Sequence, residues 1–72
     1  MMTVLNLQSI ASSGGSVIVS TANYSVLNLQ SIAMSCKAKG VDLVIKDANK
    51  LTVLNCQAIA SANPGHVTFD FT

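Results

Sequence analysis

The chain of 72 residues contains no arginine, no glutamate and no tryptophan, and only 10% of its residues are charged. A typical soluble domain has about 25% charged residues. Residues 1–36 carry no charged side chain, and all four lysines lie between Lys37 and Lys50. Without arginine, the chain lacks the planar group that binds phosphate or guanine through two hydrogen bonds. Together with a net charge of +1, this predicts no nucleic-acid partner, because such proteins carry a basic stripe.

Few residues could carry catalysis or bind a metal. The chain has one histidine, His66, two cysteines, Cys36 and Cys56, and three scattered aspartates. The cysteines are 20 residues apart, and neither has a second cysteine or a histidine nearby, which argues against zinc. The glycine pair Gly14-Gly15 follows a predicted helix, whereas a nucleotide-binding loop leads from a strand into a helix. We therefore expect no catalytic residue, no metal, no cofactor and no enzyme activity.

Long apolar runs are also missing, although half of the residues are hydrophobic. Asn, Gln and Ser interrupt the apolar runs every few residues, and the N-terminus lacks the positive region of an export signal. This predicts no membrane partner and a cytoplasmic location, where both cysteines stay reduced. An uncharged half of a small domain is poorly protected against association, so we expect a homo-oligomer.

The chain does contain one segment that is repeated three times. The copies are TVLNLQSIA (3–11), SVLNLQSIA (25–33) and TVLNCQAIA (52–60), each followed by a strand-like run. Such a repeat indicates one structural unit used several times. Each copy begins with a hydroxyl residue suited to cap a helix: Thr3, Ser25 and Thr52. The apolar residues of each copy cover one broad arc of a helical wheel, into which the repeated glutamine falls as a polar exception.

This pattern predicts an α/β fold in one domain over residues 1–72: three αβ repeats with a small, mostly parallel three-stranded sheet packed with helices. The expected helices lie near residues 3–13, 25–39 and 51–62, and the expected strands near 16–21, 41–46 and 66–71. Because Val17, Ile18 and Val19 are consecutive and apolar, the first strand is predicted to be the more central one. The alternative is a β-solenoid, in which the repeated segments are extended and stack on one another. The unequal repeat spacing and the helix stop at Gly40 favour helices.

Ser25 is the candidate regulatory residue. It lies at the predicted start of the second helix, where free N–H groups and a positive partial charge can hold a phosphate. Phosphorylation there would add about 1.5–2 negative charges to a surface otherwise free of charge. The alternative role for Ser25 is a plain helix cap.

Residues 14–60 resemble part of a STAS domain, the fold of anti-sigma-factor antagonists. The matching pieces are SVIVSTA, the helix-start Ser25 in NYSVLNLQSIAMSCKAKG, the strand VDLVIKDA and the segment NKLTVLNCQAIA. The resemblance implies a regulatory module that binds a protein partner and is phosphorylated at Ser25. The family's Asp-Ser-Ser/Ala-Gly context is replaced here by Asn23-Tyr24-Ser25-Val26.

The stretch LNLQSIAMSCKAKGVDLVI is similar to the regulatory-serine helix of HPr phosphocarriers, with Ser31 at the serine position. The histidine loop of that family is absent, so histidine phosphotransfer does not carry over to His66. We therefore expect a non-enzymatic interaction or regulatory module of STAS-like type, with a protein partner, a second copy of itself, or both. The alternatives are a structural self-assembling repeat domain and an HPr-like relative without the active histidine loop.

Overall fold

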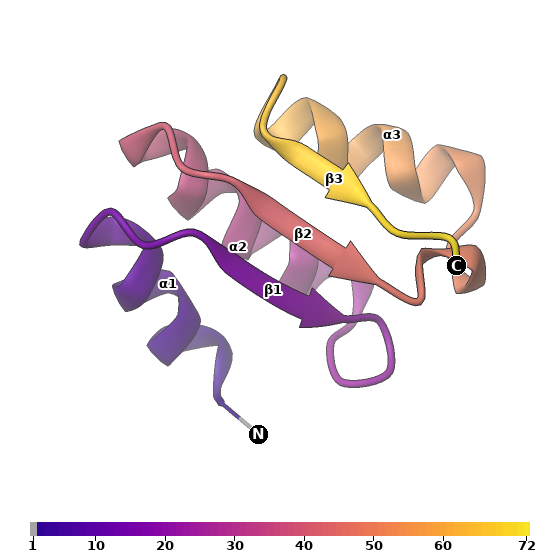
Figure 1. Cartoon of the computed structure of the whole chain (residues 1–72), viewed down its shortest axis with the longest axis horizontal. Coiled ribbons are helices and arrows are strands. Elements are labelled where there is room, and N and C mark those ends of the chain that lie inside the picture. The colour runs from indigo at the N-terminus through magenta and orange to yellow at the C-terminus, as the bar shows by residue number, and fades with distance from the viewer. Residues whose placement is uncertain (1) are drawn as a thin grey trace.

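A computed structural model describes residues 2–72, in which helices and strands alternate (Figure 1). The elements are α1 (Val4–Ser12), β1 (Val17–Ser20), α2 (Val26–Lys39), β2 (Leu43–Lys46), the 3-10 turn η1 (Ala48–Lys50), α3 (Val53–Ala62) and β3 (Val67–Phe69). The predicted α/β fold with three αβ repeats is confirmed. All three copies of the repeated segment are helical, so the β-solenoid alternative is wrong.

Each repeated segment becomes a helix because a hydroxyl group caps its first turn. The side-chain oxygens of Thr3, Ser25 and Thr52 accept the N–H three residues further on, at 3.1, 3.2 and 3.1 Å. Each cap satisfies one backbone donor that would otherwise have no partner in the helix. Gly40 ends α2 in the left-handed conformation with φ of 66°, which is typical of a glycine helix stop.

The strands form a three-stranded parallel sheet in the order β1-β2-β3 within residues 2–72. The register places Val17 opposite Leu43, and Leu43 opposite Val67. The prediction that β1 is the more central strand is wrong, because β2 occupies the middle. A fully apolar strand suits a sheet covered on both faces, but here Ile18 is 67% exposed.

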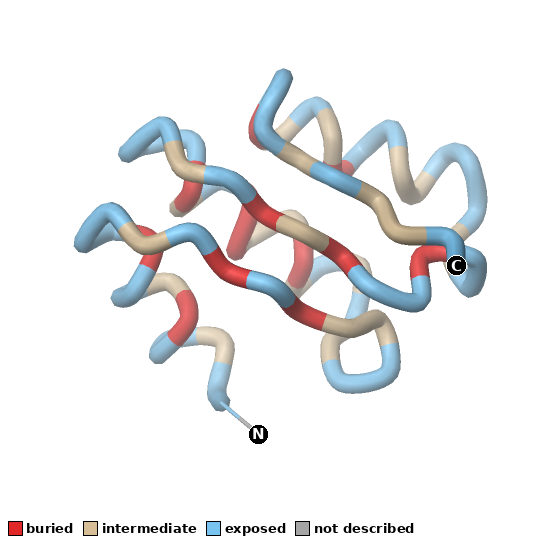
Figure 2. Tube along the Cα trace, in the orientation of Figure 1, coloured by how far each residue is buried: buried red, intermediate tan, exposed pale blue. Residues whose placement is uncertain are grey.

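The helices lie together on one face of the sheet, with α2 packed between α1 and α3 (Figure 1). Buried and exposed residues alternate along β1 and β2, as Figure 2 shows. This two-layer arrangement places one hydrophobic core between helices and sheet. The core residues are Leu7, Ala11, Val17, Val19, Leu29, Ile32, Ala33, Cys36, Leu43, Ile45, Ala48 and Ile59. Within residues 2–72, no helix has the length and apolar character needed to cross a membrane.

The buried stripe of each helix is narrower than the arc predicted from the sequence. Leu7 and Ala11 of α1 are buried, whereas Leu5, which was expected on the same face, is exposed. The polar exception Gln8 lies where α1 meets α2, and its Nε2 donates to the carbonyl oxygen of Ser31 at 3.4 Å. The glutamine position therefore lies at the contact between neighbouring helices rather than against the sheet.

Candidate functional site

The most regular surface feature is a row of exposed leucines on the outer side of the helix layer. Leu5, Leu27 and Leu54 are the second residues of α1, α2 and α3, and they are 75%, 74% and 76% exposed. Leu5 and Leu27 lie two residues, or about 200° of helix rotation, before the buried Leu7 and Leu29. Leu54 holds the equivalent position in α3. Their side chains therefore point away from the core. We name these three residues the leucine row.

The leucine row differs from the scattered apolar residues found on most protein surfaces. A single exposed leucine requires no explanation, but here the same residue recurs at the same place in three neighbouring helices. Because packed helices lie about 8–10 Å apart, the row extends over roughly 16–20 Å. Val53, which is 73% exposed, adds to its α3 end. Exposed apolar side chains that recur in neighbouring elements are candidates for an interaction site.

Ser25 lies at the same end of α2 as Leu27, the central member of the leucine row. It is exposed and directly precedes α2, two residues before Leu27. Its Oγ accepts the N–H of Asn28 at 3.2 Å, so the predicted capping role is confirmed. The hydroxyl is at the surface, where it remains accessible to modifying enzymes.

Ser31, the second predicted serine, lies in the middle of α2 and faces α1. It is half-buried, and its carbonyl oxygen accepts hydrogen bonds from Gln8 Nε2 at 3.4 Å and from Ser35 Oγ at 3.3 Å. It lies six residues after Ser25, which corresponds to about 9 Å along the helix axis. The structure therefore does not bring the two predicted serines into one site.

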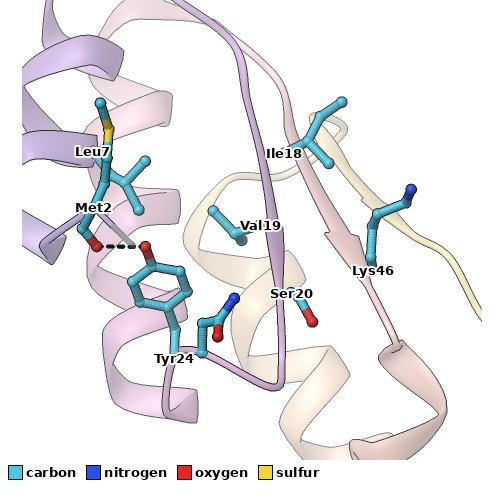
Figure 3. A pocket seen from close by; sticks show the side chains of 8 residues that line it. Met2, Leu7, Ile18, Val19, Ser20, Tyr24 and Lys46 are labelled. Atoms are coloured by element: carbon cyan, nitrogen blue, oxygen red, sulfur yellow. Dashed lines mark hydrogen bonds between the residues drawn. The ribbon is translucent and has the colours of Figure 1, made fainter.

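A pocket of about 390 Å³ opens at the carboxyl end of β1 (Figure 3). Tyr24 closes one side, and its hydroxyl donates to the carbonyl oxygen of Met2 at 2.5 Å. Among the described residues that line it, Lys46 supplies an ammonium group, but no carboxylate is present to act as a general base. The lining residues are Met2, Leu7, Ile18, Val19, Ser20, Asn23, Tyr24 and Lys46.

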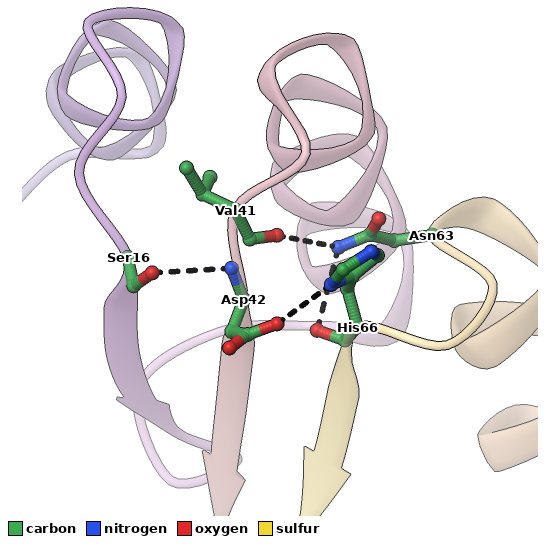
Figure 4. A network of polar contacts seen from close by, with 5 residues as sticks. All are labelled: Ser16, Val41, Asp42, Asn63 and His66. Atoms are coloured by element: carbon green, nitrogen blue, oxygen red, sulfur yellow. Dashed lines mark hydrogen bonds and ion pairs between the residues drawn. The ribbon is translucent and has the colours of Figure 1, made fainter.

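A polar network lies at the opposite, amino end of the strands (Figure 4). His66 Nδ1 lies 2.8 Å from Asp42 Oδ1, and the Asp42 N–H donates to Ser16 Oγ at 3.1 Å. The sequence-based interpretation of the three aspartates as scattered residues missed this pair, although Asp42 is exposed as expected. Each of these three residues directly precedes a strand, and the parallel register brings them side by side. That shared position was the signal that could have revealed the network.

The network contains serine, aspartate and histidine in an order that does not suit nucleophilic catalysis. Asp42 precedes the middle strand, so Ser16 and His66, which precede the two outer strands, are two strand spacings apart, or roughly 9.6 Å between backbones. A base must lie within about 3.2 Å of the hydroxyl that it activates. The contacts instead link the segments that precede the strands. Asn63, which is only 1% exposed, donates from Nδ2 to the carbonyl oxygens of Val41 and His66 at 3.1 and 3.4 Å.

Two further groups have a shifted pKa. Burial, and secondarily the negative charge of Asp42, raises the pKa of the Cys36 thiol. Hydrogen bonds from the hydroxyl and the N–H of Thr72 lower the pKa of Asp70, with a smaller contribution from Lys46.

Both cysteines are free thiols. Within residues 2–72, no group of three His, Cys, Asp or Glu side chains lies close enough together to hold a metal ion.

No family model matches the sequence, and no curated protein or solved structure is significantly similar to it. The resemblances to STAS domains and to HPr phosphocarriers therefore stay predictions. The two surface features that the structure places at the same, amino-terminal end of the helix layer are the leucine row and Ser25.

Proposed function

We propose that the protein is a non-enzymatic interaction module that binds a protein partner through the leucine row. The observation that carries this proposal is the exposure of Leu5, Leu27 and Leu54 to about three-quarters in all three repeats. At these positions a polar side chain would serve the fold equally well, because the leucines contribute little to the core. An apolar row of roughly 16–20 Å matches the apolar face of an amphipathic helix of about 11–13 residues at 1.5 Å per residue.

We further propose that phosphorylation of Ser25 regulates this binding. A phosphate on Ser25 would place about 1.5–2 negative charges two residues from Leu27, at the centre of the row. Binding of an apolar partner would then require the phosphate to lose part of its hydration, which is unfavourable. The positive end of the α2 dipole tolerates a negative group at this position. The modification therefore acts on binding while the fold is preserved.

The proposal is tested with a variant in which Leu5, Leu27 and Leu54 are replaced together by serine. The partners are first captured and cross-linked with the wild-type protein. We expect the triple variant to capture the same partners in at least about tenfold lower yield, because the apolar area buried on binding is lost. The matched control is Ile18→Ser, which removes a side chain that is 67% exposed on the other face of the molecule. Equal capture by the wild type and the triple variant, or equal loss in the control, would contradict the proposal.

Self-assembly through the ends of the repeat array is the second candidate function. Within residues 2–72, β1 and β3 each pair on one side only, so their outer edges present free backbone groups. Such edges are templates for pairing with another chain. Both candidate functions suit a protein of the cytoplasm, where the free thiols Cys36 and Cys56 stay reduced.

A further inference from the structure

Equivalent positions in the three repeats differ in exposure according to the place of the repeat in the chain. The leucine row is exposed in all three repeats and therefore belongs to the outer face. Other positions are covered in two repeats and uncovered in the third. These differences in exposure show which side of each helix is covered by a neighbouring repeat.

One set of positions is uncovered only in the third repeat. Ala11 and Ala33 are fully buried, whereas the equivalent Ala60 is only half-buried. Three more positions follow the same trend, being most exposed in the last member of each trio: Val4, Val26 and Val53; Leu7, Leu29 and Cys56; Gln8, Gln30 and Gln57. This set forms the forward flank of each helix, which the next repeat covers.

A second set is uncovered only in the first repeat. Ile32 and Ile59 are fully buried, whereas the equivalent Ile10 is 36% exposed. Two more positions follow, being most exposed in the first member of each trio: Asn6, Asn28 and Asn55; Ser13, Ser35 and Ala62. This set forms the backward flank, which the preceding repeat covers.

The two flanks lie on opposite sides of the residue that faces the sheet. At about 100° per residue, the forward positions lie roughly 0–100° to one side of Leu7, and the backward positions roughly 60–120° to the other. Inside the chain, the forward flank of one helix meets the backward flank of the next, between α1 and α2 and again between α2 and α3. The first repeat therefore presents one half of this interface, and the third repeat presents the other half.

We propose that a second copy of this chain stacks head-to-tail on the first, with its α1 and β1 packed against α3 and β3. The contact would repeat the two interfaces already formed inside the chain. In the same register, Val17 and Ile18 of the second copy would pair, through the free edge of their strand, with Val67 and Thr68. This continues the pairing of Leu43 and Val44 with Val67 and Thr68 inside one chain. This proposal rests on the second candidate function and is independent of the leucine row.

The receiving end of the molecule is hollowed and apolar. A pocket of about 320 Å³ opens beside α3 and β3, and it is lined by Leu51, Val53, Cys56, Gln57, Ala60, Phe69 and Phe71. No charged residue occurs in this lining or, among the described residues, on the backward flank of α1. Repeat proteins that remain monomeric carry polar capping repeats at their ends. Neither end flank of the helix layer carries a charge, which favours a second copy as the occupant.

The two ends differ, so the proposed interface is heterologous and does not close on itself in a pair. This allows a test with two variants that block opposite ends. Ile10→Lys places a charge on the backward flank of α1, and Gln57→Lys places one on the exposed forward flank of α3. We expect the wild type to form oligomers larger than a dimer in light scattering, and each variant alone to associate roughly a hundredfold more weakly, because an unpaired charge would be buried.

An equimolar mixture of the two variants is the decisive sample. Each still has one intact end, so the mixture should form a complex of two chains and stop there. Met34→Lys, which adds a charge at a 63% exposed position of the central helix α2, is the matched control and should assemble like the wild type. A monomeric wild type at high micromolar concentration, or a mixture that stays monomeric while the wild type assembles, would overturn the proposal. Circular dichroism of each variant verifies that it is folded.

Cross-linking tests the register in the same assembly. In a Cys56→Ser background, Ile18→Cys and Thr68→Cys chains are mixed and oxidised. Adjacent strands lie about 4.8 Å apart, within the range that a disulfide spans, so a covalent pair of one chain of each kind is expected. A Val44→Cys chain replaces the Thr68→Cys chain as the control, because Val44 lies on the middle strand. Cross-linking of Ile18→Cys chains with one another would indicate a symmetric contact and contradict the head-to-tail arrangement.

Discussion

Cys36 and Cys56 show how the same residue type behaves differently with its surroundings. Cys36 is fully buried, and burial together with Asp42 raises the pKa of its thiol. Cys56 is half-buried and lines the open pocket beside β3. Because the thiolate is the reactive form, we expect a thiol-alkylating reagent to modify Cys56 at least about tenfold faster than Cys36 in the native protein at neutral pH.

Peptide mass spectrometry after timed quenching measures the two rates separately. In urea, where both thiols are exposed, the rates should become nearly equal, and this serves as the control. Equal rates in the native protein would show that Cys36 is not protected, and the two-layer core would then have to be revised.

Residues whose role depends only on their chain neighbours were predictable. The caps Thr3, Ser25 and Thr52 and the stop at Gly40 follow from hydrogen-bond chemistry within one turn of helix. The Asp42–His66 pair was not predicted, because it depends on the register between two strands that are far apart in the sequence. A one-residue shift of β3 would separate the pair, and composition alone does not define that register.

Ser25 caps α2 and lies two residues before Leu27 of the leucine row. Substitutions of Ser25 can therefore separate an effect on stability from an effect on partner binding. Ser25→Ala removes the bond from Asn28 N–H and should lower the free energy of unfolding by about 1 kcal/mol. Ser25→Asp and Ser25→Asn both retain a capping oxygen, so urea unfolding should show nearly wild-type stability for each.

The same two capping variants differ in charge and should therefore differ in binding. We expect Ser25→Asp to weaken partner capture and Ser25→Asn to leave it unchanged, because only aspartate places a negative charge beside Leu27. Equal capture by both variants would remove the regulatory role of Ser25 and leave it as a helix cap.

The strands were predicted as elements but not in their spatial order. The consecutive apolar residues Val17, Ile18 and Val19 predicted a strand with both faces covered. The helices instead cover one face, which leaves Ile18 exposed. Strand order depends on where the crossover helices pack, and a run of three apolar residues carries no information about that. The helix-facing sides of β1 and β2 were predictable, since period-two alternation applies to either arrangement.

At the scale of the whole molecule, the three repeats are alike in sequence but unequal in surroundings. The repeat predicted three αβ units, and the structure confirms them. It could not predict which flank of each unit stays uncovered, because that depends on the number of neighbours rather than on the unit itself. One substitution made at three equivalent positions therefore measures the effect of neighbours directly.

Replacement of Ile10, Ile32 or Ile59 by alanine is such a series. Ile32 and Ile59 are fully buried, so each replacement should lower the free energy of unfolding by about 2–5 kcal/mol. Ile10 is 36% exposed and lacks a preceding repeat in the described chain, so its replacement should cost less than about half as much. Urea unfolding at dilutions where light scattering shows single chains measures this without a contribution from assembly.

Raising the protein concentration extends the same series. If a second copy covers Ile10, the stability of the wild type should increase with concentration by mass action, and that of the Ile10→Ala chain should increase less. Met34→Ala, at an exposed position of α2 outside both end flanks, should show the same dependence of stability on concentration as the wild type. Equal costs at all three isoleucines in dilute solution would mean that Ile10 is already covered within a single chain, which contradicts the uncovered backward flank from which the stacking is inferred.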